Sequence, residues 1–403
     1  MIPVTEALSI IVGKTETLAL ERVRLGEALG RVLAEDVFAD TDLPPFDRAQ
    51  MDGYAVRAED LRATPARLRV VGEAAAGSGW RGALRAGEAV RIMTGAPLPT
   101  GADSVQQVEV TSEEEGGDFV VIERATEPGQ FYVPRASEIS SGERVLEAGE
   151  EISAARMAVL ASFGYALVPV RGRPRVAVLA TGTELVQVEE RPGEDQIRDS
   201  NSYSLAAYAR LAGAEVERLP FAGDDPELLR EEIEKAAARS DLLVLSGGVS
   251  MGRYDFTKAA LHALGAEVFF ERVALRPGKP TVFARLPGGA LVFGLPGNPV
   301  SVSVTFNLFA RTALRVMQGA RRPEPFEETA VLSRPARGAA ERASYLPAAL
   351  STDADGRLLA EPLKWGGSSD FVAFARAEAL VIVPVGVRAV EAGSTVNVVR
   401  LPG

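Results

Sequence analysis

The chain has 403 residues, 46% of them hydrophobic, which is enough for about two to four domains with sizeable cores. Its net charge of −11 offers no general basic surface for nucleic acid, so any anionic ligand needs a local positive site. Cysteine is absent and His262 is the only histidine, which excludes disulfides and thiolate sites and argues against histidine-based metal sites. The sequence shows no signal-peptide pattern and no run long enough to span a membrane, so we expect a soluble cytoplasmic protein.

The first part of the chain predicts two helices followed by a small β-domain. Apolar residues at helical spacing predict a helix within 3–18, and a second helix is expected at 25–33. Strand-forming runs separated by turns predict strands at 67–71, 88–93, 104–110 and 119–122. Residues 151–163 predict a helix that ends at Gly164, and 168–174 are interpreted as a linker.

Two loops of this β-domain carry polar residues. Asp47, Arg48, Asp52 and Tyr54 lie close together before a strand, which is typical of a functional loop. The Asp-Gly pair at 52–53 fits an ordinary hairpin turn equally well. Thr94 follows a second strand end.

From residue 175, strands and helices alternate, which predicts a doubly wound, mostly parallel sheet. The expected strands are 176–180, 215–219, 242–245, 266–273, 281–283 and 291–293. The expected helices are 203–211, 226–238, 256–264 and a long apolar helix to Met317. Ligands of such sheets bind outside the carboxyl ends of the strands. We therefore expect one edge to gather the loops 181–185, 246–255, 276–280 and 294–301.

The loops at this edge suit an oxyanion. Gly247 and Gly248 leave backbone N–H groups accessible, and Asn298-Pro299 begins a helix whose N-terminus favours negative charge. Arg276 and Lys279 add two cations held between prolines. The loop is not a Walker loop, because the sequence lacks that pattern.

Carboxylates lie beside these cations, at Glu184, Asp224, Asp225 and Asp255. A few carboxylates next to substrate oxygens suit hydrated Mg²⁺. Each acid also has a plainer interpretation: Asp225 fits a helix cap better than a ligand, and Asp255 fits both equally. His262 is expected in helix packing or at the surface, and Lys258 is a candidate for a simple ion pair with Asp255.

Residues 326–403 show no long helical pattern, and runs at 329–332, 379–383 and 395–399 predict a compact β-domain. Its one loop with functional character is Trp365-Gly366-Gly367-Ser368-Ser369.

Seven segments together resemble the molybdopterin molybdenumtransferases, the MoeA family, which is related to the gephyrin E domain. They are FDRAQMDGYAV (46–56), RIMTGAP (91–97), ATGTEL (180–185), RDSN (198–201), SGGVSMGRYD (246–255), RPGKP (276–280) and GLPGNPVS (294–301). Each segment alone is a weak signal, but seven in this order are very specific.

The resemblance implies an α/β plus β fold in an elongated, four-part subunit that forms a homodimer. The implied domains are 1–38 with 136–172 (helical and linking), 39–135 (inserted β-domain), 173–322 (α/β molybdopterin-binding module) and 323–403 (C-terminal β-domain). Residues 1–18 are a candidate to pack on the α/β module. In family members the site lies between the α/β module of one subunit and the β-domain of the other.

The implied activity belongs to molybdenum cofactor biosynthesis. The enzyme would insert molybdenum from molybdate into adenylylated molybdopterin and release AMP, using Mg²⁺ or a similar ion. The upstream molybdopterin adenylyltransferase is a candidate partner. The alternatives are a non-catalytic molybdopterin-binding scaffold of the gephyrin type, a tungstate-using form of the same enzyme, and an adenylyltransferase acting with ATP.

The resemblance also implies residue roles. The catalytic group would be Asp52, Thr94, Glu138, Glu184, Asp224 (or Asp225) and Asp255, with Asp52, Glu184 and Asp255 at the metal. The binding group would be Ser200, Asn201, Gly247, Gly248, Arg276, Lys279, Pro296, Pro299, Ser301 and Ser368. Three departures stand out: Glu138 replaces a common Asp, Arg272 and Arg276 replace lysines, and Pro347 replaces an oxyanion-binding arginine. The last one leaves the choice between molybdate and tungstate open.

Overall fold

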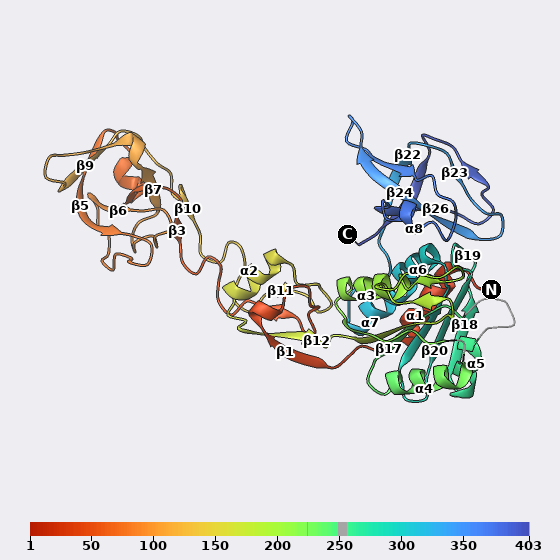
Figure 1. Cartoon of the computed structure of the whole chain (residues 1–403). Helices are drawn as coiled ribbons and strands as arrows, with labels where there is room; N and C mark the ends of the chain where they lie inside the picture. Colours follow the sequence, from red (N-terminus) through yellow and green to blue (C-terminus); the bar gives the residue numbers. More distant parts are fainter. Residues whose placement is uncertain (224, 249–255, 403) are drawn as a thin grey trace. The chain divides into compact units, whose positions relative to one another are not determined.

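The structure is a computed structural model that describes residues 1–223, 225–248 and 256–402 (Figure 1). The chain forms two compact units. The first unit comprises Met1–Glu35, Ala148–Ala154 and Leu167–Gly403, and the second comprises Asp36–Glu147 and Ala155–Ala166. Within the described ranges, no helix combines the length and the apolar character needed to cross a bilayer.

A six-stranded sheet organises the first unit. Its order is β16 (Glu215–Arg218), β13 (Arg175–Ala180), β17 (Leu242–Ser246), β21 (Leu291–Leu295), β20 (Pro280–Arg285) and β18 (Glu267–Arg272). The first four strands are parallel, and β20 and β18 are antiparallel to their neighbours. The predicted mostly parallel sheet is therefore confirmed.

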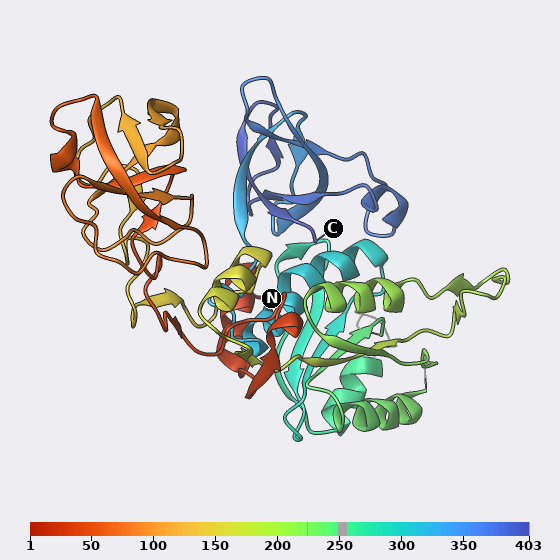
Figure 2. The ribbon, with the colours of Figure 1, turned by 90° about the vertical axis from the view of Figure 1, so that its left-hand side faces the viewer.

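Helices cover both faces of this sheet (Figures 1 and 2). One face carries α1 (Val4–Lys14), α3 (Asn201–Leu211), α6 (Pro299–Thr305) and α7 (Arg311–Met317), and the other carries α4 (Pro226–Ala237) and α5 (Phe256–Ala263). Strand side chains alternate between the two cores: Val176 and Val178 join the first, and Ala177 and Leu179 the second. Each face is buried in this way, which explains why these strands read as continuous apolar runs.

The helix that follows β21 is interrupted by one π-helical turn, Phe306–Ala310, between α6 and α7. The predicted long apolar helix is thus present, but its middle turn is wider than an α-turn. Such turns change which side chains line up along the helix.

Two predictions for the N-terminal region were wrong. Only a single 3₁₀ turn, Leu25–Glu27, forms in the expected helix at 25–33, because Gly30 takes a left-handed φ of 73° and breaks the helical path. The supposed linker contains β12 (Leu167–Arg171), which pairs with β1 (Leu20–Arg24). Val168 and Val170 are buried there, so they serve the core.

The C-terminal part of the first unit is a small barrel. Its strands are β22 (Glu327–Leu332), β23 (Ala336–Arg337), β24 (Ala343–Thr352), β25 (Leu358–Pro362), β26 (Ala379–Val383), β27 (Ala389–Val390) and β28 (Thr395–Arg400). Strand β26 pairs with both β24 and β28, which closes the sheet. Barrel residues Tyr345, Leu380 and Val399 share a core with the helices above the parallel sheet. The short strand β19 (Leu275–Arg276) leaves that sheet and pairs with β24.

The second unit is built on another six-stranded sheet. The order is β7 (Ser104–Gln107), β4 (Gly53–Val56), β6 (Glu88–Ile92), β5 (Ala66–Ala74), β9 (Phe119–Ile122) and β8 (Thr111–Glu113). Shorter pairs join β3 (Arg48–Ala49) to β10 (Tyr132–Val133) and β2 (Val37–Phe38) to β11 (Arg144–Leu146). Helix α2 (Ala154–Ser162) ends before Gly164, as predicted. The predicted strands at 67–71, 88–93 and 119–122 are confirmed, whereas the one at 104–110 ends at Gln107, because Val108–Val110 form a 3₁₀ turn.

Candidate functional site

The carboxyl ends of β13, β17 and β21 are held at one level by backbone hydrogen bonds. The N–H of Thr181 donates to the carbonyl of Ser246 over 2.8 Å. The N–H of Gly247 donates to the carbonyl of Leu295 over 3.1 Å. Three of the predicted loops therefore begin side by side at this edge of the sheet.

Gly247 and Gly248 follow β17 in left-handed conformations, with φ of 97° and 64°. A Cβ on Gly247 would lie 2.4 Å from the carbonyl oxygen of Thr181. A Cβ on Gly248 would lie 2.7 Å from the hydroxyl oxygen of Thr257. Only glycine fits both positions, and the bare backbone leaves room for a ligand at the strand end.

Asn201, the first residue of α3, links two of these loops. Its Nδ2 donates to the hydroxyl of Ser246 over 2.9 Å and to the carbonyl of Gly297 over 2.7 Å. Its Oδ1 is buried and finds no hydrogen-bond donor among the described residues. Because the amide orientation is fixed by two acceptors, Oδ1 remains available to accept from a ligand N–H or O–H.

Sequence reasoning missed the residue that positions Asn201. Asp199 is 3% exposed and accepts hydrogen bonds from both the N–H and the hydroxyl of Ser202. These bonds hold the first turn of α3 in place. Ser200, the residue between Asp199 and Asn201, is exposed at the start of this helix. An Asp two residues before a helix is a recognisable capping signal, so the sequence did contain this information.

The start of α6 is tied to the C-terminal barrel. Nδ2 of Asn298 donates to the hydroxyl of Ser368 over 2.8 Å, and the N–H of Val300 donates to the carbonyl of Ser368 over 3.0 Å. Asp370 braces this loop by accepting from Gly366 and Ala373, and the Gly366 N–H bond contributes most to lowering the pKa of Asp370. Ser368 therefore lies at the same edge as Pro296, Pro299 and the buried Ser301, although it comes from another sheet.

The two predicted cations lie in the loop that packs against α6. A Cβ on Gly278 would be 2.4 Å from a methyl group of Thr305, so this loop and α6 are in close contact. Lys279 is half-buried, and its carbonyl accepts from the N–H of Val273. Arg276 is exposed and lines a cavity of about 400 Å³. The charged and aromatic residues that share this cavity are Arg334, Arg337, Lys364 and Trp365.

Pro347, where the resemblance led us to expect an arginine, is buried in β24. Its carbonyl accepts from the N–H of Leu363. The residue thus has a structural place in the barrel wall and contributes no charge to the edge.

The acidic residues divide into three cases. Glu184 is exposed, and no ion pair or side-chain hydrogen bond is recorded for it in the described ranges. Asp225 caps α4 by accepting from the N–H groups of Glu227 and Leu228, which supports its interpretation as a cap. Asp224 and Asp255 lie outside the described residues. No group of three or more metal-ligating side chains occurs in the part of the chain that the structure describes, so the three-acid metal site stays a prediction.

The remaining ionisable groups near α5 have ordinary surroundings. The imidazole of His262 is 64% exposed and lies 3.9 Å from Glu271. Lys258 lies 3.7 Å from the same carboxylate. His262 is therefore a surface residue, which was one of its two predicted placements.

Asp52 and Thr94 form a compact pair in the second unit. The N–H and the hydroxyl of Thr94 both donate to Oδ1 of Asp52, over 2.7 and 2.8 Å. These two bonds lower the pKa of Asp52 below its ordinary value of 3.8, and the bond from the backbone N–H contributes more than the bond from the hydroxyl. Arg48 lies 3.7 Å from Glu138, and Arg48 and Thr94 line a cavity of about 570 Å³. Three predicted catalytic residues thus belong to one unit, while Glu184 belongs to the other.

The chain matches three family models in sequence. Residues 2–164 match the MoeA N-terminal region (domain I and II), 177–316 a probable molybdopterin binding domain, and 329–401 the MoeA C-terminal region (domain IV). The chain belongs to the MoeA family. A Bacillus subtilis (strain 168) protein named molybdopterin molybdenumtransferase is 37% identical over 411 residues, covering 99% of this chain and 94% of its own. A Nostoc sp. protein of the same name is also 37% identical, covering 95% of this chain and 89% of its own.

A solved MoeA structure agrees with the fold. The molybdopterin biosynthesis MoeA protein of Pyrococcus horikoshii OT3 superposes with a TM-score of 0.85 at 29% identity, with both chains fully covered. The resemblance seen in the seven sequence segments, and the multidomain MoeA architecture expected from it, are confirmed.

The glycines of this MoeA chain give a direct test of the strand-end geometry. Gly247→Ala is expected to lower the free energy of unfolding by about 1–3 kcal/mol, because its Cβ would overlap the carbonyl of Thr181 in a left-handed backbone. Gly297→Ala is a matched control, since its Cβ would meet only the Cα of Gly247 at 3.8 Å. Urea unfolding compares the two variants. Equal effects of the two substitutions would contradict the described geometry.

The Asp52–Thr94 pair gives a second test. Thr94→Val removes the hydroxyl donor and keeps the stronger N–H donor, so the pKa of Asp52 should rise only part of the way to 3.8. A depressed folded-state pKa means that the stabilisation from ionised Asp52 is lost as the pH falls through that value. NMR titration of the Asp52 carboxyl carbon measures the shift, with Thr111→Val as the control. An unchanged pKa in Thr94→Val would show that the hydroxyl contributes nothing.

Proposed function

We propose that this chain transfers molybdenum from molybdate to adenylylated molybdopterin and releases AMP. The proposal is supported by full-length similarity to relatives named molybdopterin molybdenumtransferase. One structural observation carries it: Asn201, Gly247, Lys279 and Ser368, from separate loops of two sheets, belong to one edge. That edge offers backbone space, an unpaired acceptor and cations, which are the groups needed to hold a phosphorylated heterocycle beside an oxyanion.

In this proposal the strand ends bind the pterin substrate. Gly247 and Gly248 allow its phosphates to approach the backbone, since no side chain fills this space. The unpaired Oδ1 of Asn201 accepts a hydrogen bond from a ring N–H, and Ser200 precedes Asn201 in the chain. Binding therefore depends on the hydrogen bonds that hold Asn201 against Gly297.

The second half of the edge holds the oxyanion. Arg276 and Lys279 supply positive charge, and the hydroxyls of Ser301 and Ser368 donate hydrogen bonds. Pro296 and Pro299 shape the wall around them. This arrangement brings the oxyanion to the dithiolene sulfurs, which take up the metal as the phosphoanhydride is cleaved and AMP leaves. Pro347 adds no positive charge that could favour one oxyanion, so the proposal covers both molybdate and tungstate.

A divalent ion fits the remaining acids. Mg²⁺ is commonly held by one or two carboxylates together with substrate oxygens, and Glu184 offers a carboxylate with no recorded partner in the ranges described. Glu184, Asp255 and Asp52 would hold the ion, which when bound polarises the phosphoanhydride. Thr94 orients Asp52, and Asp224 and Glu138 complete the acidic group.

We propose that the site is completed in a homodimer, by Asp52 of the partner subunit. The support is that Asp52 and Thr94 form an ordered pair in a unit separate from the parallel sheet.

The upstream molybdopterin adenylyltransferase is the proposed supplier of the substrate. The cytoplasm is the proposed location.

Lys279 gives the sharpest test of this function. Lys279→Ala should lower kcat/KM for molybdate at least about tenfold, because a charge-assisted hydrogen bond to the oxyanion is lost. The measurement is AMP release from adenylylated molybdopterin with molybdate or tungstate and Mg²⁺. Lys235→Ala is the control, because Lys235 is exposed and pairs with Glu231 and Glu232 of its own helix α4. Folded wild-type protein that releases no AMP with either oxyanion would refute the proposed function.

A further inference from the structure

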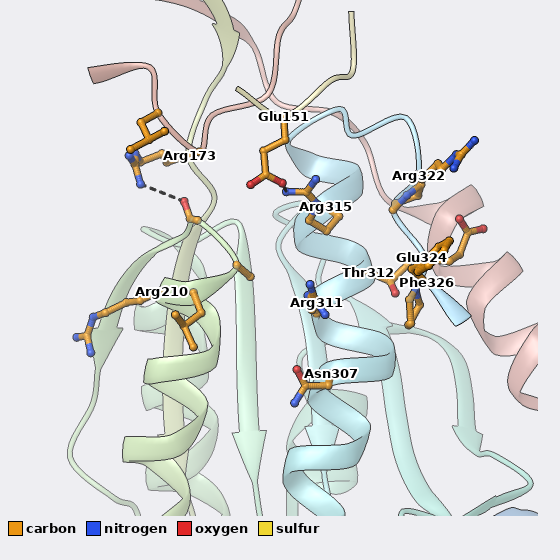
Figure 3. A pocket seen from close by; sticks show the side chains of 17 residues that line it. Glu151, Arg173, Arg210, Asn307, Arg311, Thr312, Arg315, Arg322, Glu324 and Phe326 are labelled. Atoms are coloured by element: carbon orange, nitrogen blue, oxygen red, sulfur yellow. Dashed lines mark hydrogen bonds and ion pairs between the residues drawn. The ribbon is translucent and has the colours of Figure 1, made fainter. Parts of the chain in front are cut away.

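A second cationic cavity lies at the C-terminal end of α3 and beside α7 (Figure 3). Helix α3 starts with Asn201 and ends at Leu211, so the cavity beside Leu211 is about 15 Å from Asn201 along the helix. The cavity has a volume of about 410 Å³, which is in the range of small-molecule sites. It is therefore separate from the edge described above.

The lining of this cavity is strongly positive in a chain of net charge −11. The charged residues are Arg173, Arg210, Arg311, Arg315 and Arg322, with Glu151 and Glu324 as the only acids in the lining. Arg315 is paired with Glu151 over 3.0 Å. Arg311 is half-buried and forms no salt bridge within residues 1–223, 225–248 and 256–402, although Glu151 lies close enough to influence its charge. A surplus of arginines around one hollow suits a multiply charged oxyanion, which guanidinium groups bind in a bidentate manner.

Two of the arginines lie one turn apart on α7, directly after the π-helical turn. Asn307, Arg311 and Arg315 follow one another along the same side of the helix, facing the end of α3 (Figure 3). Burial, and then the neighbouring Arg315, lower the pKa of Arg311, while Glu151 acts in the opposite direction. Glu151 also pairs with Arg315, so one carboxylate serves two partly buried arginines, and a further anion would stabilise both.

Asn307 provides an independent sign of a ligand. It is 1% exposed, and its Nδ2 donates to the carbonyl of Ser303 over 2.9 Å. This bond fixes the amide orientation, because a carbonyl can only accept. Asn307 belongs to the cavity lining, and its Oδ1 is buried without a partner among the described residues. A ligand that carries a hydroxyl would satisfy it.

Two backbone carbonyls just after the C-terminus of α3 already accept hydrogen bonds from side chains. The carbonyl of Ala212 accepts from Nε2 of Gln318 over 2.8 Å, and that of Gly213 accepts from Arg173 over 3.4 Å. These bonds weaken the repulsion that the C-terminus of α3 would exert on an anion.

The rim of the cavity is apolar. Leu29, Leu211 and Phe326 line it and are 58%, 58% and 69% exposed. These three exposed apolar side chains line the same cavity as the arginines. They suit a flat or apolar group attached to the anion.

We propose that this cavity binds a phosphate monoester whose organic part carries a hydroxyl and a flat, apolar group. The phosphate lies between Arg311, Arg315 and Arg322, the hydroxyl donates to Asn307, and the flat group packs on Phe326. The proposal does not depend on the activity proposed above.

The test uses the full-length protein and isothermal titration with UMP, uridine and inorganic phosphate as probes. UMP should bind, phosphate should bind more weakly, and uridine should not bind detectably. Arg311→Gln and the exposed Arg322→Gln should each weaken UMP binding about tenfold or more, because each loses a charged contact. Arg230→Gln, on the opposite face of the sheet, is the matched control, and Lys279→Ala should leave UMP binding intact.

Several results would overturn the proposal. They are the absence of UMP binding to wild-type protein, uridine binding as tight as UMP binding, and unchanged UMP affinity in both arginine variants. Loss of UMP binding in Lys279→Ala alone would assign the nucleotide to the candidate functional site instead. Sedimentation of each variant completes the test: a changed oligomeric state without a change in UMP affinity would show that a second copy of the chain occupies the cavity.

Discussion

The side-chain amide of Asn201 is the interaction on which the candidate site depends. It joins the hydroxyl of Ser246, at the end of β17, to the carbonyl of Gly297, in the loop after β21. Together with the backbone bond from Gly247 to Leu295, it fixes two parallel strand ends and the start of α3 relative to one another. Backbone hydrogen bonds align the strand ends, and this amide adds the start of α3 to them.

The C-terminal barrel contributes to the site because it shares a core with the helices above the sheet. Tyr345 and Leu380 of the barrel pack into that core, and β19 crosses from one sheet to the other. As a result, the loop that carries Ser368 is held at the start of α6 by two hydrogen bonds. The acidic net charge of the chain does not oppose anion binding, since arginine and lysine side chains gather locally around both cavities.

The sequence predicted those features that arise from local patterns. Continuous apolar runs indicated the buried parallel strands, Asp225-Pro226 indicated the start of α4, and the order of the seven segments indicated the MoeA family. Features that depend on contacts between distant residues were missed. Strand β12 pairs with β1, about 150 positions earlier in the chain, and Asn298 contacts Ser368, which is 70 residues away. Asp224 and Asp255 lie outside the described residues, so their roles remain predictions.

The most direct test of the central claim is anomalous diffraction from crystals soaked with molybdate or tungstate. Our account predicts a heavy-atom peak at the carboxyl edge of the sheet, within hydrogen-bonding reach of Nζ of Lys279 and the hydroxyl of Ser368. It also predicts that the peak disappears in Lys279→Ala crystals. A fully occupied peak elsewhere, with none at this edge, would contradict the placement of the oxyanion and the mechanism built on it.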